Sequence, residues 1–462
     1  MNEIDFKTNA EKYGADLLEE VRLFSDCYDG AAIRAELYED GRLRADVYVG
    51  GDRRSFDAPL PAGDALEIKR LTKRFIKLAL YDTLSAHYGV SLPWGSLTGV
   101  RPTKLAYEYL RRGGSADSVA GYLTDTFRVS PGKAAVVADI IAAQSGYIGN
   151  LGRKVNLYVH IPFCDGRCAY CSFPSADMNR HAGLLGAYLE KLNEEIREVK
   201  TLIASDNLDI LSVYVGGGTP SVLTEKQIAE LMEAIDVRGA EFTFEAGRPD
   251  SITDGKLAAI ADGGADRLCL NPQTLNDDTL ARIGRRHTSA QFFDAFEAAR
   301  RYGFSVNTDI IAGLEGETFA DFTVTADKIR EMSPDNVTVH TLSRKRGSEL
   351  ADRELHAENI SAMTDYAYTV FSDSYRPYYL YRQKNMLGNL ENIGYSLPGK
   401  ECVNNITVME ELVPVYACGA GGISKKIVGG VISRHASPKD PRLYVSEFGS
   451  RLEAKKAFFA GA

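Results

Sequence analysis

The chain has 462 residues, too many for one compact core, and it carries a formal net charge of −9 with a pI near 5.5. This acidity argues against a surface that coats nucleic acid. The composition, with 44% hydrophobic and 25% charged residues, is that of an ordinary soluble protein. The first residues are charged, and the sequence has no run of about 18 apolar residues. We therefore expect a cytoplasmic protein with no membrane span and no nucleic-acid partner.

Residues 1–150 are predicted to form an N-terminal α+β domain. Alternating apolar and polar residues on both sides of Glu39-Asp40-Gly41 predict a β-hairpin over residues 31–48. Helical periodicity follows at about Gly63–Tyr88, Pro102–Arg112, Ser115–Thr126 and Ser130–Ser145. For the segment Trp94–Leu105 we expect only the capped start of a helix.

Residues 151–345 alternate between short apolar runs and amphipathic helices, a pattern typical of a parallel sheet with right-handed crossovers. The predicted strands are Val155–His160, Ile210–Val215, Phe242–Glu245, Arg267–Leu270, Ser305–Ile311 and Val337–Leu342. Six such units predict an α/β fold, a partial (β/α)6 TIM-like barrel. Barrels of this type carry their chemistry at the carboxyl ends of the strands. The notable residues fall there: Cys164, Gly216, Glu245, Gln273 and Asp309.

Residues 346–462 are predicted to be a short C-terminal extension that completes the core and covers the substrate site. The pattern predicts a helix near Ala357–Ser374 and a Tyr-rich strand at Arg376–Tyr381. A hairpin is expected across Gly429-Gly430, and a last amphipathic helix at about Leu443–Phe459.

Three closely spaced cysteines form the strongest motif. Cys164, Cys168 and Cys171 follow the first predicted barrel strand with the spacing C-x3-C-x2-C, and Gly166 relieves the turn between the first two. Three thiolates on one loop can hold an iron–sulfur cube, whose fourth iron then stays open to another ligand. A zinc site that includes His160 is the alternative, and a disulfide is disfavoured in a chain without a secretory signal.

The other four of the seven cysteines are Cys27, Cys269, Cys402 and Cys418. They are scattered singly, which fits a reducing compartment. Cys269 and Cys418 lie in apolar strand-like runs, so we expect them to be core residues.

The residues around the cysteine loop, Y-V-H-I-P-F-C before it and Y-C-S-F at its end, resemble the signature of the radical S-adenosylmethionine (SAM) enzymes. They are most similar to oxygen-independent coproporphyrinogen III oxidases, and the whole chain resembles the HemZ-type coproporphyrinogen dehydrogenases. The resemblance implies a [4Fe-4S] cluster on Cys164, Cys168 and Cys171, whose open iron binds SAM. An electron delivered by a flavodoxin or ferredoxin type of donor then releases a 5′-deoxyadenosyl radical.

The resemblance also implies a set of SAM-binding residues at the strand ends. They are Gly217, Gly218, Thr219, Glu245, Gln273, Arg285 and Asp309. Three glycines let the backbone approach a ligand closely, and a guanidinium can hold a carboxylate in a bidentate fork. Two alternatives stay open: Glu245 could form a structural salt bridge with Arg248 or Arg267, and Asp309 could be a capping aspartate.

Tyr158 and His160 share one face of the strand that enters the cysteine loop. In similar enzymes this tyrosine belongs to the active site, so we predict Tyr158 as a catalytic residue, while His160 either supports the loop or acts in the reaction. Two stretches resemble the family's late motifs and could face a tetrapyrrole substrate, namely Gly419–Ser424 and Tyr381–Asn385. Surface exposure is the competing interpretation, and it is favoured for Arg344-Lys345-Arg346.

Two features depart from the coproporphyrinogen pattern. Cys171 is followed by Ser172-Phe173 where that branch has a further cysteine, and its large C-terminal cover domain is missing. We predict oxidative decarboxylation of coproporphyrinogen III in haem synthesis. The alternatives are a haem-trafficking chaperone of the same superfamily and a radical SAM enzyme for another tetrapyrrole. The chaperones carry a late tryptophan, whereas the only tryptophan here is Trp94.

Overall fold

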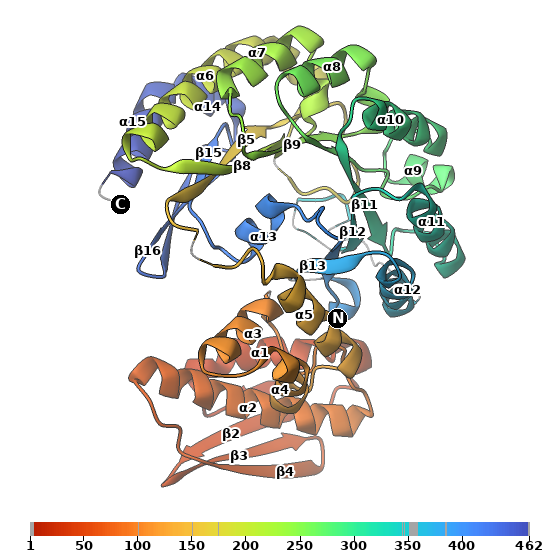
Figure 1. Cartoon of the computed structure of the whole chain (residues 1–462). Helices are drawn as coiled ribbons and strands as arrows, with labels where there is room; N and C mark the ends of the chain where they lie inside the picture. Colours follow the sequence, from red (N-terminus) through yellow and green to blue (C-terminus); the bar gives the residue numbers. More distant parts are fainter. Residues whose placement is uncertain are drawn as a thin grey trace. The chain divides into compact units, whose positions relative to one another are not determined.

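The computed structural model describes residues 4–99, 101–149, 151–173, 175–343, 345, 347–350, 359–383 and 386–460. The chain divides into two compact units, residues 1–138 and 139–462 (Figure 1). The domain boundaries expected at residues 150 and 345 stay predictions. Within the described residues, no helix is both long and apolar enough to span a membrane.

The first unit is built on a four-stranded sheet in the order β1-β2-β3-β4. The strands are β1 (Phe6–Thr8), β2 (Ile33–Glu39), β3 (Arg42–Val49) and β4 (Asp52–Pro59). Helix α2 (Ala65–Tyr88) packs on β3 and β4, and α1 (Gly14–Arg22) packs on α2. The predicted hairpin is confirmed as β2 and β3. The sequence analysis missed β4 because its exposed residues D-R-R-S show no apolar alternation.

Three further predicted helices of the N-terminal part are confirmed as α3 (Pro102–Arg111), α4 (Val119–Phe127) and α5 (Pro131–Gln144). Helix α3 does begin within the segment Trp94–Leu105, but the expected cap is wrong, because the Arg101 side chain forms no cap hydrogen bond. Pro102 at the first helical position starts the helix instead, since its fixed φ suits that position. Trp94 is fully buried.

The second unit contains an eleven-stranded sheet, and the six predicted strands form its parallel centre in the order β12-β11-β10-β9-β8-β5. They are β5 (Lys154–Ile161), β8 (Asp209–Gly217), β9 (Glu241–Gly247), β10 (Arg267–Leu270), β11 (Ser305–Ala312) and β12 (Asn336–Thr341). The helices that alternate with them cover the convex side of the curved sheet (Figure 1). They are α6 (Met178–Ser205), α7 (Glu225–Ile235), α8 (Asp254–Asp262), α9 (Asp277–Arg282), α10 (Ser289–Arg301) and α11 (Phe319–Met332). The predicted partial barrel is confirmed.

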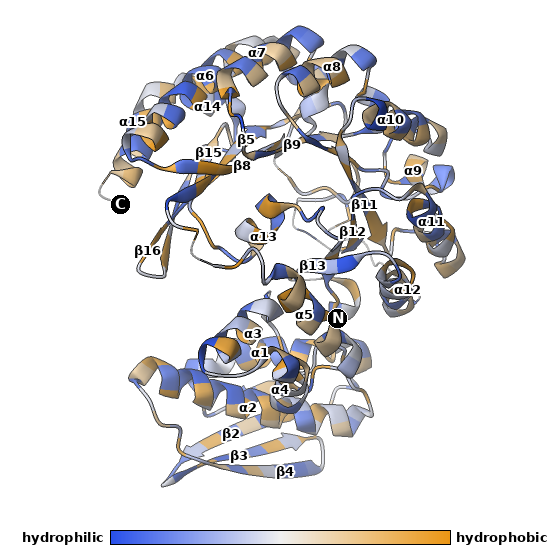
Figure 2. Cartoon of the chain, viewed as in Figure 1, coloured by the Kyte–Doolittle hydropathy of each residue, from blue (hydrophilic) through white to orange (hydrophobic). Residues whose placement is uncertain are grey.

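The two faces of each barrel strand differ in chemistry. Along β5, Val155, Leu157 and Val159 are fully buried, whereas Tyr158 and His160 lie on the other face. Figure 2 shows hydrophobic residues on β11 and β12 and a mixture of both kinds on the surrounding helices. The apolar face therefore packs against the helices, and the polar face lines the interior of the barrel.

The C-terminal segment adds five strands to both ends of the same sheet. Strands β13 (Arg376–Tyr381) and β14 (Asn392–Ser396) extend it antiparallel beyond β12, while β15 (Val415–Cys418) lies parallel to β5. The predicted hairpin is confirmed as β16 (Ile423–Val428) and β17 (Val431–Ala436). The prediction of one last helix is wrong, because Glu447 interrupts the helical conformation and separates α14 (Pro441–Ser446) from α15 (Phe448–Phe459). The helix expected at Ala357–Ser374 is α12 (Ile360–Ser372). The first two residues of the expected range, 357 and 358, lie outside the described residues.

A polar layer closes the barrel at the amino ends of its strands, and helix α13 (Val403–Met409) fills this end. We call this the floor layer; it consists of Asn156, Ser212, Glu241, Arg267 and Asn307. Glu241 accepts hydrogen bonds from the first backbone N–H groups of α13, and Arg267 pairs with Glu241 at 3.5 Å. In Figure 1, α13 lies on the concave side of the sheet. The amino end is thus plugged, and a ligand site must lie at the carboxyl ends.

Candidate functional site

The cysteine loop leaves the carboxyl end of β5 and is held by backbone contacts along its length. Gly166 has φ of +85°, as expected for the turn between the first two cysteines. The Ala169 N–H donates to the carbonyl of Ile283 at 3.0 Å, and the Arg248 guanidinium donates to the carbonyl of Asp165. These contacts hold the loop against neighbouring segments of the barrel.

The three cysteine side chains lie close enough to influence one another. Burial raises the pKa of the Cys164 thiol and of the Cys171 thiol, and each nearby cysteine adds to the effect. Thr219 offsets this for Cys164, because its hydroxyl donates to Sγ at 3.5 Å. A bound metal centre is what holds such thiols as thiolates.

The described residues show no closed zinc site around the loop. Among the described residues, no three His, Cys, Asp or Glu side chains converge on a point that could hold a single metal ion. An iron–sulfur cube needs its cysteines on separate corners rather than around one ion. All three cysteines are free and partly accessible in the structure.

The glycine run at the end of β8 lies directly under the cysteine loop. A Cβ atom at Gly218 would come within 2.5 Å of the Phe163 carbonyl and 3.0 Å of Cys164 Sγ. Gly217 has φ of +114°, and a Cβ there would meet the His160 ring at 2.6 Å. No side chain fits at either position, so the backbone at the end of β8 packs closely against β5 and the cysteine loop. Its predicted contact with SAM stays a prediction.

Glu245 lies near the carboxyl end of β9, beside this glycine run, and a Cβ at Gly216 would be 2.5 Å from its carboxylate. The salt-bridge alternative is wrong, since Arg248 pairs with Asp250 and Arg267 pairs with Glu241. Burial and the nearby Asp309 carboxylate raise the pKa of Glu245 to about 7. The Gly217 N–H and the Tyr214 hydroxyl oppose this shift through hydrogen bonds. A group that brings a positive charge or a hydrogen-bond donor would stabilise the ionised carboxylate.

Gln273 follows β10 in a strained backbone conformation, with φ of +70°. Its N–H and C=O bridge to β11, through Asp309 and Ile311 respectively. The side chain is 8% exposed, and its Oε1 atom has no hydrogen-bond partner among the described residues. Strain together with an unsatisfied buried polar atom is expected where a ligand completes the site.

Arg285 is buried in the loop after α9 and donates to the backbone carbonyls of Gly247 and Asn271. Its Nε atom has no partner within the described part of the chain. Its neighbour Arg286 is exposed and forms a surface pair with Asp165 at 3.1 Å. Backbone contacts hold the Arg285 guanidinium without neutralising it, so it can still bind an anion such as a carboxylate.

Asp309 lies on the interior face of β11, and the capping alternative is wrong. Its carboxylate Oδ2 is 3.5 Å from Nε2 of His340 on β12, and its N–H donates to Oδ1 of Asn271 at 3.2 Å. The Asp309 side chain is 26% exposed. The second carboxylate oxygen is thus available to accept hydrogen bonds from a ligand.

Tyr158 and His160 lie side by side on β5, with ring centroids 5.9 Å apart, and Tyr158 stacks on Tyr214 of β8 at 6.1 Å. Burial and the Glu245 charge raise the pKa of Tyr158, so its phenol is neutral. Burial lowers the pKa of His160 to about 4. Both side chains therefore enter the site uncharged.

Of the two stretches predicted to face a substrate, Gly419–Gly422 lies against β5. A Cβ at Gly421 would be 3.3 Å from the His160 ring, and the Gly419 N–H donates to the buried Glu195 carboxylate at 2.7 Å. In the second stretch Tyr381 faces His340, and Arg382 donates to Asn389, whereas Lys384 and Asn385 lie outside the described residues. Of the run Arg344-Lys345-Arg346 only Lys345 is described, and its ammonium lies 5.9 Å from the Phe173 ring.

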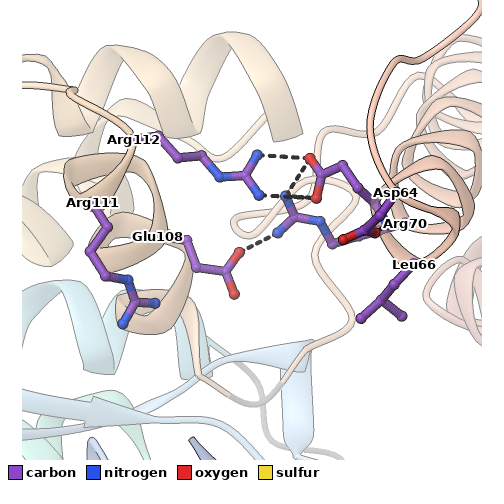
Figure 3. A pocket seen from close by; sticks show the side chains of 7 residues that line it. Asp64, Leu66, Arg70, Glu108, Arg111 and Arg112 are labelled. Carbon is purple, nitrogen blue, oxygen red and sulfur yellow. Dashed lines mark hydrogen bonds and ion pairs between the residues drawn. The ribbon is translucent and has the colours of Figure 1, made fainter. Parts of the chain in front are cut away.

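A cavity of about 370 Å³ lies in the first unit, and four of the charged side chains that line it pair with one another (Figure 3). Arg112 forms a two-pronged pair with Glu67, at 2.8 and 3.0 Å, and Arg70 pairs with Glu108. Both arginines lower the pKa of Glu67 to about 2. Since these charges satisfy one another, the cavity has no evident chemistry.

The sequence analysis missed three side chains of the barrel interior: Tyr214, Asn271 and His340. Tyr214 lies beside Tyr158 in the strand register, and His340 lies beside Ile311. Both stand at alternate positions of predicted strands, so period-two alternation was the signal that could have identified them. Asn271 gave no such signal, because its contact with Asp309 depends on how β10 ends.

The cysteine loop, the glycine run and the polar strand ends lie at one end of a partial barrel. A model of the radical SAM superfamily matches residues 158–329. This range includes the cysteine loop, the glycine run and the strand ends up to β11, and it stops before β12. The structure is also similar to coproporphyrinogen III oxidase (HemN) from Escherichia coli, with a TM-score of 0.52 and 22% identity over 65% of this chain and 70% of that one. At this identity the likeness concerns the fold. The class is thus that of the radical SAM proteins.

Two curated relatives narrow the class. The chain is 37% identical over 408 residues to the oxygen-independent coproporphyrinogen-III oxidase-like protein HemZ of Bacillus subtilis, which covers 84% of this chain and 81% of that protein. It is 30% identical over 335 residues to the heme chaperone HemW of Lactococcus lactis, with 67% and 82% covered. The chain therefore belongs to the family of oxygen-independent coproporphyrinogen-III oxidase-like proteins that includes HemZ, as its motifs predicted.

The cofactors of this superfamily are a [4Fe-4S] cluster and SAM, and the site fits both. Three free cysteines on one fixed loop suit a cluster with one open iron. The unsatisfied Gln273 Oε1, the unneutralised Arg285 and the side-chain-free strand end at Gly217 and Gly218 suit a polar ligand beside it.

Proposed function

We propose that this protein is an oxidoreductase that decarboxylates two of the four propionates of coproporphyrinogen III to vinyl groups without oxygen. The observation that carries the proposal is the set of incompletely satisfied polar groups next to the cysteine loop, on a chain 37% identical to HemZ. Free thiols throughout the chain fit the cytoplasm, where we place the reaction. The net charge of −9 gives no support to a nucleic-acid partner.

The proposed roles follow from the contacts of each residue. Cys164, Cys168 and Cys171 hold the cluster, while the backbone at Gly217 and Gly218 and the Glu245 carboxylate receive the amino group of SAM. Thr219 belongs to this end of the site and steadies Cys164 through its hydroxyl. Arg285 binds the SAM carboxylate, Gln273 completes its hydrogen bonds with SAM, and Asp309 accepts from the ribose hydroxyls.

When bound, the two cofactors supply an oxidant that removes a hydrogen atom from the β-carbon of a propionate. Tyr158, neutral and stacked on Tyr214, orients the reacting group at the end of β5. Loss of CO2, with transfer of the remaining electron to an external one-electron acceptor, then leaves the vinyl double bond. The electron donor is a small low-potential protein of the flavodoxin or ferredoxin type.

A second candidate function is haem binding, which the 30% identity to the heme chaperone HemW supports. One experiment separates the two. Protein reconstituted anaerobically with iron and sulfide is reduced and incubated with SAM and coproporphyrinogen III, then separately with haem, and the products are identified by mass. Protoporphyrinogen IX with stoichiometric methionine release supports the decarboxylase. Tight binding of haem without methionine release supports the chaperone, and a modified haem indicates a different tetrapyrrole reaction.

A further inference from the structure

The His340 imidazole lies next to the Asp309 carboxylate inside the barrel, and the Tyr381 phenol lies next to the imidazole. His340 projects from β12 with Nε2 at 3.5 Å from Asp309 Oδ2. Its other nitrogen, Nδ1, is 3.4 Å from the hydroxyl of Tyr381 on β13, and the two rings meet edge to face with centroids 6.5 Å apart. Asp309, His340 and Tyr381 come from three strands and form a row of successive contacts, which we call the line.

We propose that His340 is a positioning residue for Asp309, and that Tyr381 fixes the orientation of His340. The inference rests on the proposed role of Asp309 as the acceptor for the ribose hydroxyls of SAM. It adds that the C-terminal segment, through Tyr381, takes part in binding SAM. Neither His340 nor Tyr381 touches SAM in this arrangement; both act through the carboxylate.

The polarity of the line is set by its ends. A carboxylate only accepts hydrogen bonds, and Nε2 of His340 lies 3.5 Å from it. The proposed arrangement therefore has Nε2–H facing Asp309, with Nδ1 accepting the phenolic proton of Tyr381. Burial and the Asp309 charge raise the pKa of Tyr381, which keeps that proton on the phenol. The chain Tyr381 O–H to His340 to Asp309 thus has a single direction.

The contact uses one carboxylate oxygen and leaves the other for a ligand. His340 faces Oδ2, and the backbone N–H of Asp309 is bound by Asn271, so both the side chain and the backbone of Asp309 are fixed. The side chains of Asp309 and His340 remain 26% and 27% exposed. A pair that served only the core would be sealed off, whereas this one borders accessible space. An oriented acceptor costs a ligand less entropy to bind than a mobile one.

Tyr379 provides a matched control on the same strand. It stacks on Tyr381 with ring centroids 6.3 Å apart, but its hydroxyl bonds to Thr338 Oγ1 at 3.0 Å rather than to His340. Tyr379→Phe therefore removes a buried hydroxyl two residues away and leaves the line intact. His340→Gln is the conservative variant, because an amide nitrogen can still donate to Asp309.

The experiment measures binding rather than turnover. Equilibrium dialysis with radiolabelled SAM is run on reconstituted, oxidised protein, with the iron content and melting midpoint of each variant recorded. We expect His340→Ala to weaken SAM binding about tenfold and Tyr381→Phe about threefold, as for loss of a charge-assisted and a neutral hydrogen bond. His340→Gln should recover most of the affinity, and Tyr379→Phe should match the wild type.

A double-mutant cycle makes the test specific. In the Asp309→Asn background, His340→Ala should weaken SAM binding less than about twofold further, because its effect passes through the carboxylate. Additive losses, or an affinity within twofold of wild type for His340→Ala, would overturn the inference. So would an Asp309→Asn variant that binds SAM normally. If His340→Ala loses its cluster, Tyr381→Phe is used in the same cycle. Failure to decarboxylate coproporphyrinogen III alongside these shifts would count against the proposed function only.

Discussion

The two ends of the barrel interior are both polar, but they differ in whether their charged side chains pair with one another. In the floor layer, Asn156 donates to Thr407 and accepts from Ser212. Arg267 pairs with Glu241 and donates to Asn307, although its Nε atom has no partner among the described residues. At the carboxyl ends, Glu245 has no cationic partner among the described residues and lies near the Asp309 carboxylate, and Arg285 is held by backbone carbonyls alone. Charges that pair with one another hold the fold together, whereas a buried charge without a partner is costly and can be stabilised by a bound ligand. The difference separates structural from functional polarity within one barrel.

The cysteine loop should give the largest effect. Cys164→Ala, Cys168→Ala and Cys171→Ala are each expected to abolish the cluster, because a cube held by only two thiolates does not persist. Iron content and the visible absorbance of anaerobically reconstituted protein check this. Cys27→Ala, in the first unit, is the control and should retain the full cluster. Unchanged iron in the three loop variants would remove the basis for the site.

Glu241→Ala tests the floor layer. The variant leaves Arg267 buried without its partner and removes the acceptor for the first N–H groups of α13, so we expect a loss of about 3–5 kcal/mol in unfolding free energy. Denaturant unfolding measures it, and Glu230→Ala on the surface of α7 serves as the control. If the loss stayed below about 1 kcal/mol, the floor layer would not be the stabilising end.

Arg285→Ala tests the other end. We expect SAM binding to weaken about thirtyfold, since the SAM carboxylate loses its charged partner. Loss of the two hydrogen bonds to the Gly247 and Asn271 carbonyls should also lower the unfolding free energy by about 1–3 kcal/mol. The neighbouring variant Arg286→Ala removes only an exposed pair with Asp165 and should bind SAM normally. Equal effects of the two variants would contradict the assignment of Arg285.

Glu245→Gln should have the smallest effect, and one of unusual sign. Because the folded-state pKa of Glu245 is raised to about 7, the stability contributed by its protonated form is complete below the unfolded pKa and is lost as the pH rises through 7. The amide removes this loss, so the apoprotein should gain about 2 kcal/mol at pH 8 and almost nothing at pH 5. The same variant should bind SAM more weakly. Thermal unfolding at the two pH values decides it, and a variant less stable at pH 8 would refute the burial of an unpaired charge.

The sequence predicts the parallel strands well because each one has a continuous apolar face, as in Val155, Leu157 and Val159. It predicts the cysteine loop because three ligands lie within eight residues. Partners distant in sequence escape it: the contact of His340 with Asp309 joins adjacent strands, and that of Glu241 with α13 joins residues about 160 apart. The exposed strand β4 and the break at Glu447 were missed because neither follows an apolar period.

The order of strands in the sheet sets an order of events during synthesis. Strand β5 pairs on one side with β8, which follows it soon in the chain, and on the other with β15, which ends at Cys418. A ribosome that has finished β12 has therefore produced every strand of the parallel centre while one edge of β5 is still uncovered. The glycine loop that packs on His160 arrives later still. The pairing of β5, the strand that leads into the cysteine loop, is therefore completed among the last steps of synthesis. A cluster inserted before that point would bind to a loop whose supporting strand still has one unpaired edge.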